Sequence, residues 1–178
     1  LRRYLSGERP QPAELFAQLT NVVDHFIDFE QSLAPQRAMS ELIACYILAT
    51  WFLDAFNVIS FLWPSGDRDS GKTKLLTLVA ELGYLGQVIL AGGTYATLRD
   101  LADYGATLAF DDAEALGDPK RGDPNKRNLF LAGNRRGSRV TLKEMAYGQW
   151  TVKYVNTYCA RLFSATRLPD PILASRTT

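Results

Sequence analysis

The sequence has few of the side chains on which many enzymes depend. Its 178 residues include one histidine, His25, and two cysteines, Cys45 and Cys159. Without a second histidine or a C-x-x-C pair, no zinc-ligand spacing is present, and a Ser-His-Asp hydrolase has little support. Both cysteines have apolar neighbours, which indicates buried thiols in a reducing, cytoplasmic setting.

A large net charge and a long apolar run are also missing. The 20 Lys and Arg residues nearly balance the 19 Asp and Glu residues, so overall charge gives no argument for nucleic-acid binding. The longest apolar stretch runs from Leu42 to Phe56 and is interrupted by Thr50 and Asp54. It is shorter than the roughly 20 residues that span a bilayer. We therefore expect a buried helix there and no membrane partner.

The N-terminal part of the chain has the pattern of helices. Apolar residues recur every three or four positions between Ala13 and Phe29, which predicts an amphipathic helix. Pro35 separates it from a more apolar helix expected at about 36–55. We assign residues 1–35 to a tail and an amphipathic helix, and residues 36–178 to a larger domain.

After residue 56 the pattern changes to short apolar runs between helical segments. We expect helices at 72–82, 94–103, 124–133 and 170–176, and strands at 57–63, 87–91, 106–110, 139–142, 150–154 and 158–163. This alternation predicts an α/β fold with the three-layer architecture of P-loop NTPases and a mostly parallel, five-stranded sheet.

A phosphate-binding motif follows the first of these strands. The residues that fit G-x-x-x-x-G-K-[ST] are Gly66, Asp67, Arg68, Asp69, Ser70, Gly71, Lys72 and Thr73. Glycines allow the backbone to curl so that successive N–H groups point at phosphate oxygens. Lys72 would reach the β- and γ-phosphates, and the Thr73 hydroxyl would bind magnesium. We also count the next residue, Lys74, among those that bind the nucleotide. The motif therefore predicts binding of ATP and Mg²⁺.

Two acidic residues inside this loop are unusual beside the phosphate charges. Asp67 and Asp69 flank Arg68, which partly offsets them. Because the loop binds phosphate through its backbone, we expect both carboxylates to face solvent and to lower nucleotide affinity.

An acidic pair follows the strand expected at 106–110. The carboxyl ends of parallel strands share one edge of a sheet, so Asp111 and Asp112 should lie beside the phosphate loop. Asp111 would hold magnesium through water, and Asp112 would orient or activate the attacking water. Glu114 is an alternative base. The competing interpretation is an acidic cap of the next helix.

The C-terminal segment resembles the AAA+ superfamily. An apolar strand ends at Ser164 and Thr166, and a short helix then ends at Arg176. The resemblance implies that Ser164 or Thr166 is the first sensor, although asparagine is commoner there. It also implies that Arg176 is an arginine finger for the neighbouring subunit. The alternative for Arg176 is a surface arginine at a helix C-terminus.

Further segments resemble the ATPase part of phage, plasmid and integrative-element primase–helicase proteins over about residues 40–178. They are 94–98, 111–114, 132–137 and 168–170. The resemblance implies a ring-forming homo-oligomer that moves along or remodels DNA. The helical C-terminal lid of that superfamily is lacking, so we expect a piece of a longer polypeptide.

One basic stretch, 135–139, could contact DNA phosphates or the nucleotide of a neighbouring subunit, or it could be a solvated turn. Because Trp51, Trp63 and Trp150 have apolar neighbours, we expect them in the core, with no platform for base stacking. The function favoured by the sequence is ATP hydrolysis coupled to work on DNA. A small-molecule kinase and a nucleotide-binding module without turnover are the alternatives.

Overall fold

The computed structural model describes residues 5–90, 93–111, 113, 123–146 and 148–178. The chain divides into two compact units between Ala49 and Thr50. Among the described residues, every helix is too short or too polar to cross a lipid bilayer.

The first unit consists of helix α2 (Pro12–Phe26) and most of helix α3 (Gln36–Trp51). Proline in the first turn suits the start of α2, where a backbone donor has no helical partner. The Gln36 side chain joins the helices, since its Nε2 donates to the Ile27 carbonyl at 2.8 Å and its Oε1 accepts from the Phe29 amide at 2.6 Å. The prediction of two helices is confirmed, although α3 ends before a short 3₁₀ turn, η1 (Leu53–Ala55).

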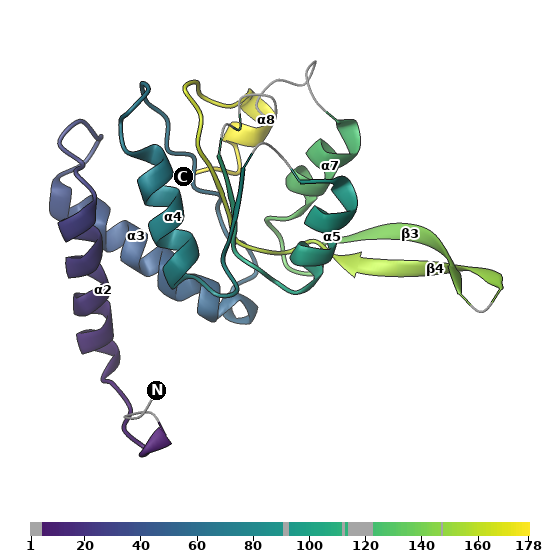
Figure 1. Ribbon diagram of the computed structural model, residues 1–178, viewed down its shortest axis with the longest axis horizontal. Coiled ribbons are helices and arrows are strands. Elements are labelled where there is room, and N and C mark those ends of the chain that lie inside the picture. The colour runs from purple at the N-terminus through teal and green to yellow at the C-terminus, as the bar shows by residue number, and fades with distance from the viewer. Residues whose placement is uncertain (1–4, 91–92, 112, 114–122, 147) are drawn as a thin grey trace. The chain divides into compact units, whose positions relative to one another are not determined.

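The second unit is built on a parallel sheet (Figure 1). Its strands have the order β1-β2-β5 and are short. Their bounds are β1 (Gln87–Ile89), β2 (Leu108–Phe110) and β5 (Arg161–Phe163), and the helices of this unit are α4 (Lys72–Leu82), α5 (Tyr95–Asp103), α7 (Pro124–Ala132) and α8 (Pro171–Ala174). The α/β class predicted from the sequence is confirmed.

Helices cover both faces of this sheet. Leu108 and Phe110 of β2 are buried in one apolar cluster with residues of α5 and α7. Ala109 between them points to the opposite face, as alternate residues of a strand do, and α4 packs against β1 and β2. Side-chain caps begin two of these helices. Thr94 accepts a hydrogen bond from the Thr97 amide, and Asp123 accepts one from the Asn125 amide.

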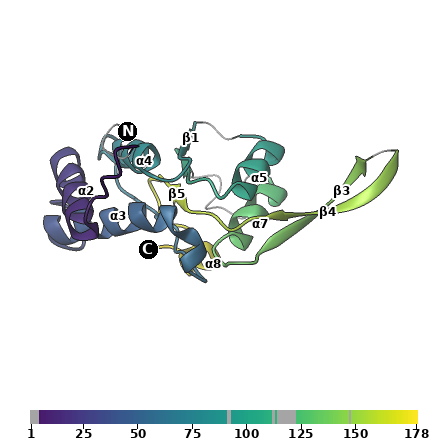
Figure 2. The ribbon, with the colours of Figure 1, turned by 90° about the horizontal axis from the view of Figure 1, so that it is seen from below.

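The prediction of a mostly parallel, five-stranded sheet is wrong. Strands β3 (Arg139–Ala146) and β4 (Gln149–Asn156) pair with each other and form a separate antiparallel sheet, set apart from β1, β2 and β5 in Figure 2. Only a short turn joins them, and a short turn favours antiparallel pairing over the crossover that a parallel sheet requires.

The segment before the phosphate loop also differs from its prediction as a strand over 57–63. Its residues form isolated bridges, of which Leu62–Leu162 and Ser65–Ala165 are parallel pairs. Pro64 lacks a backbone N–H and therefore cannot donate to a continuous ladder. The segment nevertheless runs parallel to β5 and beside it. The loop that follows the segment therefore begins at the carboxyl edge of the sheet, where β5 ends.

The core of the second unit is aromatic. The rings of Phe110 and Phe163 stack at 5.1 Å, and Phe61, Trp63 and Phe130 are buried around them. The prediction for Trp63 is therefore confirmed. Trp51 and Trp150 were predicted in the core, but they are 56% and 62% exposed. Cys159 is buried as expected, whereas Cys45 is exposed.

A buried arginine lies beneath this cluster. Arg161 is 0% exposed, and its Nη1 and Nη2 donate to the carbonyls of Phe130 (3.0 Å) and Thr157 (2.7 Å). A Cβ at position 133 would lie 1.6 Å from Nη1 of Arg161. Gly133 therefore provides the space that the guanidinium occupies.

Candidate functional site

The predicted phosphate loop curls into the N-terminus of α4. Gly71 is the N-cap of α4 and has φ of 82°, in the left-handed region that glycine enters without steric cost. Asp69 has φ of 62°, which aspartate tolerates better than most residues. The loop thus has the curved backbone that directs successive amides toward one point.

The Lys72 ammonium is bonded to its own loop. Its Nζ donates to the carbonyl oxygens of Gly66 (2.8 Å) and Asp67 (2.5 Å) and to the Ser70 hydroxyl (3.1 Å). These bonds engage the three donors of the ammonium. A phosphate bound at this site would have to replace some of these three oxygens as an acceptor of the Lys72 ammonium.

Asp111, at the carboxyl end of β2, connects two neighbouring segments. Its Oδ2 accepts a hydrogen bond from the Thr73 hydroxyl at 3.0 Å, and its Oδ1 accepts one from the Ser164 hydroxyl at 2.5 Å. Thr73 lies in the first turn of α4, and Ser164 directly follows β5. The three polar groups meet because β2 and β5 are adjacent and parallel.

A cavity of about 910 Å³ opens between these elements. Most of the predicted binding residues line it. They are Arg68, Asp69, Ser70, Gly71, Lys72, Thr73, Lys74, Asp111, Ser164 and Thr166. Gly66 and Asp67 lie behind Lys72 and contact it through their carbonyls. Asp112 and Glu114, the predicted catalytic bases, lie outside the described residues.

The Thr73–Asp111 pair has the chemistry of a magnesium site. Hydroxyl and carboxylate oxygens are the ligands that Mg²⁺ prefers, and Mg²⁺ commonly keeps several waters and takes its remaining oxygens from phosphate. Thr73 Oγ1 and Asp111 Oδ2 are 3.0 Å apart at the cavity wall, so one cation could contact both groups directly or through water. These residues therefore fit the predicted cofactor.

Arg176 does not line this cavity. It follows α8, its carbonyl accepts from the Phe61 amide at 2.8 Å, and its side chain is partly buried. Within the described part of the chain, Nη1 of Arg176 is buried without a hydrogen-bond partner.

An ion pair connects α7 with the start of α8, the helix that precedes Arg176. Arg127 Nη2 lies 2.8 Å from Asp170 Oδ2, with both side chains largely buried. Asp170 is also the N-cap of α8. Burial is the largest single influence on the pKa of Asp170 and acts to raise it, but the hydrogen bonds and charge of Arg127 and the α8 amides together lower that pKa.

The basic stretch 135–139 forms a turn against the segment after η1. Arg136 donates from its amide to the Asn57 carbonyl and from Nη1 to the Asp54 carbonyl. Gly137 has φ of 81° at the turn, and Arg139 begins β3. At least one of these arginines is therefore used in packing the turn.

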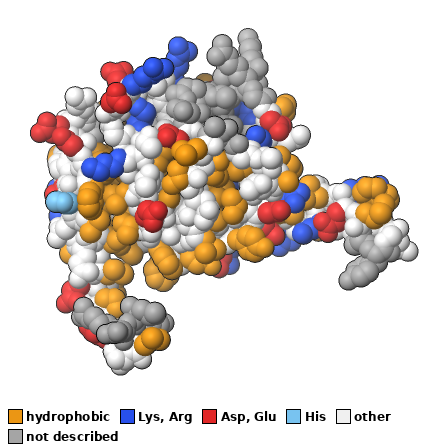
Figure 3. All heavy atoms as spheres, viewed as in Figure 1, with side chains coloured by type: hydrophobic (Ala, Val, Ile, Leu, Met, Phe, Trp, Pro, Cys, Tyr) orange, Lys and Arg blue, Asp and Glu red, His pale blue; other side chains and the backbone are white. Residues whose placement is uncertain are grey.

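The β3–β4 hairpin carries a surface that sequence reasoning missed. Met145 pairs with Trp150, and both are exposed, as are Val152 and Tyr154 farther along β4. Lys143 Nζ lies 5.8 Å from the centre of the Trp150 ring. Figure 3 shows hydrophobic side chains on this hairpin. The available signal was the strict alternation of polar and apolar residues over 149–154, which indicates a strand with one apolar and one polar face.

The chain has no match among protein-family models or among curated protein sequences. Its function must therefore be argued from the site itself.

Proposed function

We propose that residues 50–178 bind and hydrolyse ATP with Mg²⁺, as the core of an oligomeric motor that acts on DNA. The observation that carries the proposal is the junction of Thr73, Asp111 and Ser164 beside a curled loop that ends in Lys72. Backbone amides, one ammonium and an adjacent carboxylate are the groups that P-loop enzymes use on a triphosphate.

In this proposal the loop amides and the N-terminus of α4 bind the phosphates. Lys72 exchanges the carbonyls of Gly66 and Asp67 for phosphate oxygens. Mg²⁺, when bound at Thr73 and Asp111, offsets charge on the phosphates. Ser164 holds the Asp111 carboxylate in place, and Thr166 at the cavity wall is the second candidate for contact with the γ-phosphate.

Two further roles complete the proposal. Asp112 orients the attacking water, with Glu114 as the alternative base. Arg176 acts on the nucleotide of a neighbouring subunit, for which its partly buried side chain would have to extend from its own subunit.

The hairpin supports DNA as the partner. Trp150, Val152 and Tyr154 lie on one face of β4, opposite Met145, Lys143 and Thr141 of β3. Glu144 pairs with Thr151 and lies on the other face. Exposed aromatic rings beside basic groups are the means by which proteins bind single-stranded nucleic acid without sequence preference.

The test is the rate of ATP hydrolysis by the full 178-residue chain with and without single-stranded DNA. We expect DNA to raise the rate. Trp150→Ala should weaken DNA binding by about ten-fold, because stacking of one base on an aromatic ring has that order of energy. Thr151→Ala, on the opposite face, is the matched control. Hydrolysis that requires a small-molecule acceptor and ignores DNA would contradict the proposal in favour of a kinase.

A further inference from the structure

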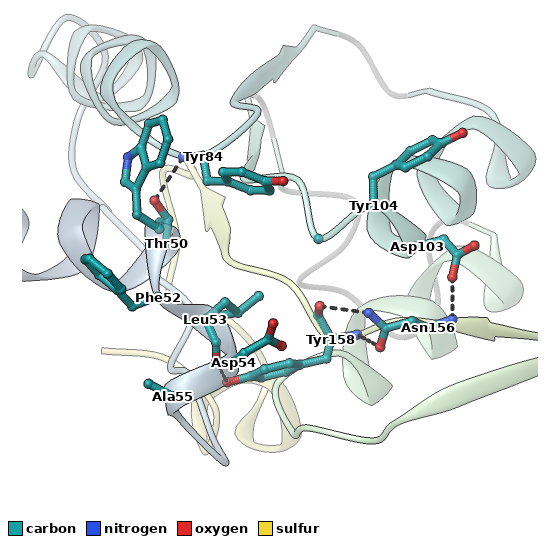
Figure 4. Close-up of a pocket in the computed structure, with 12 residues that line it drawn as sticks. Thr50, Phe52, Leu53, Asp54, Ala55, Tyr84, Asp103, Tyr104, Asn156 and Tyr158 are labelled. Carbon is teal, nitrogen blue, oxygen red and sulfur yellow. Dashed lines mark hydrogen bonds between the residues drawn. The ribbon is translucent and has the colours of Figure 1, made fainter. Parts of the chain in front are cut away.

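A second cavity, of about 510 Å³, lies at the amino edge of the parallel sheet (Figure 4). Its walls come from segments that precede three strands, with Tyr84 before β1, Tyr104 before β2, and Tyr158 before β5. The end of α3 and the η1 turn complete it. Asp111 and Ser164 follow β2 and β5 at the carboxyl edge, so this cavity is separate from the candidate nucleotide site.

Aromatic rings held in fixed positions form much of this cavity. Trp51 and Tyr84 meet edge to face, with centroids 5.5 Å apart and planes at 76°. Trp51 Nε1 donates to the Leu82 carbonyl at 2.9 Å, and the Tyr84 amide donates to the Thr50 hydroxyl at 3.0 Å. The hydroxyl of Tyr158 donates to the Phe56 carbonyl at 3.0 Å, which holds the Tyr158 ring in place.

The charged side chains that line this cavity are acidic. Among the residues that the structure describes, Asp54 and Asp103 are the two charged groups in its wall, and no lysine, arginine or histidine lines it. Asp103 accepts a hydrogen bond from the Asn156 amide at 2.8 Å, while Figure 4 shows the Asp54 carboxylate pointing into the hollow above Tyr158. Arg136, which is not among the lining residues, donates from Nη1 to the backbone carbonyl of Asp54 at 2.8 Å.

The charges of both Asp54 and Arg136 reach the floor of the cavity. Burial is the main cause of the raised pKa of Tyr158; Arg136 acts to lower that pKa and Asp54 acts to raise it.

The surroundings of the cavity are apolar and accessible. Phe52 lines the cavity and is 63% exposed. Phe56 and Leu85, the sequence neighbours of the lining residues Ala55 and Tyr84, are 43% and 51% exposed. Exposed large apolar residues grouped around a polar pocket are typical of protein-binding surfaces. A free small amine would leave them uncovered.

We propose that this cavity binds an arginine side chain of a partner protein, with apolar residues beside that arginine packing on Phe52, Phe56 and Leu85. The faces of aromatic rings attract cations, and a planar guanidinium also stacks on them. Asp54 and Asp103 supply the opposite charge. The same carboxylates repel phosphate, and no lining lysine or arginine among the described residues offsets them, which favours a cationic occupant over a nucleotide or a nucleic acid.

The probe is the peptide acetyl-Leu-Arg-Leu-amide, titrated into the ¹⁵N-labelled full chain while the tryptophan indole N–H signals are followed by NMR. Trp51 lines the cavity, whereas Trp63 is buried against the Arg167 carbonyl and Trp150 lies on the hairpin. We expect the Trp51 signal, assigned with Trp51→Phe, to shift in a saturable way while the other two stay constant.

Two comparisons make the test specific. The same peptide with citrulline in place of arginine has the same shape without the charge, and we expect it to bind at least about ten-fold more weakly. The Asp54→Asn/Asp103→Asn protein should lose affinity to a similar extent, whereas Asp28→Asn/Glu30→Gln, which removes two exposed carboxylates elsewhere, should not. Unchanged Trp63 and Trp150 signals verify that each variant is folded.

Three results would overturn the proposal. The first is binding of the citrulline peptide as tight as that of the arginine peptide. The second is a Trp51 signal that does not move at about 10 mM arginine peptide, a concentration at which even weak binding is detectable. The third is a shift of the Trp51 signal on addition of a thymidine oligonucleotide. None of them depends on ATP hydrolysis, so failure here is distinguishable from failure of the proposed function.

Discussion

The hydroxyl of Ser164 lies 2.5 Å from Oδ1 of Asp111, and the other oxygen of that carboxylate accepts a bond from Thr73. Ser164 thus contacts the proposed magnesium ligand directly. It is a positioning residue in this arrangement, whose effect on the nucleotide passes through Asp111.

Replacing Ser164 with alanine should therefore weaken the use of Mg²⁺ more than the binding of ATP. Loss of a group that orients a metal ligand typically costs roughly 10–100-fold in metal affinity or activity. We expect the Mg²⁺ concentration for half-maximal hydrolysis to rise by that order, with ATP affinity changed by less than about three-fold. Ser164→Thr, which keeps the hydroxyl, should restore most of the activity. An unchanged Mg²⁺ dependence in Ser164→Ala would contradict the positioning role.

Gly133→Ala should strongly destabilise the second unit. The added Cβ would lie 1.6 Å from Nη1 and 2.2 Å from Cζ of Arg161, which is fully buried and held by two carbonyls. We expect a loss of about 3 kcal/mol or more in the free energy of unfolding, measured by urea denaturation. Gly137→Ala meets open space at φ of 81° and should cost only about 1–2 kcal/mol. Equal effects would show that Arg161 can move at little cost.

The ion pair between Arg127 and Asp170 should make stability depend on pH in the acid range. The pKa of Asp170 is lowered in the folded state, so the folded protein binds fewer protons here than the unfolded chain. Its contribution is fully present above the ordinary aspartate pKa of about 3.9 and is lost as pH falls through the lowered pKa.

Asp170→Asn is the matched variant, because asparagine can still cap α8. We expect it to be less stable than the original chain at neutral pH, with the difference shrinking below about pH 4. Thermal unfolding monitored by circular dichroism at several pH values measures this. A difference that stays constant down to pH 2 would show that the pair contributes through packing alone.

The features predicted correctly from the sequence depend on short stretches of chain. The loop 66–73 and helix α4 follow from glycines and a helical pattern within a few residues. The meeting of Asp111 with the loop could also be predicted, because an apolar run that ends in an acid implies the carboxyl edge of a strand.

The features that were missed depend on the partner of each segment. An apolar run does not reveal which strand it pairs with, so β3 and β4 were assigned to the wrong sheet. Trp51 and Trp150 have apolar neighbours in sequence but are exposed in space. The aromatic cavity combines residues from 50 to 158, and no local pattern predicts that assembly.

The most direct test of the account is the affinity of the full chain for ATP in the presence of Mg²⁺, measured by isothermal titration calorimetry with Lys72→Ala beside Lys126→Ala. Lys72 is bonded within the loop, whereas Lys126 lies on α7 outside the cavity. The account predicts saturable binding that Lys72→Ala weakens by at least about ten-fold and Lys126→Ala leaves unchanged. Equal ATP affinity in both variants, or no binding by the original chain, would contradict it.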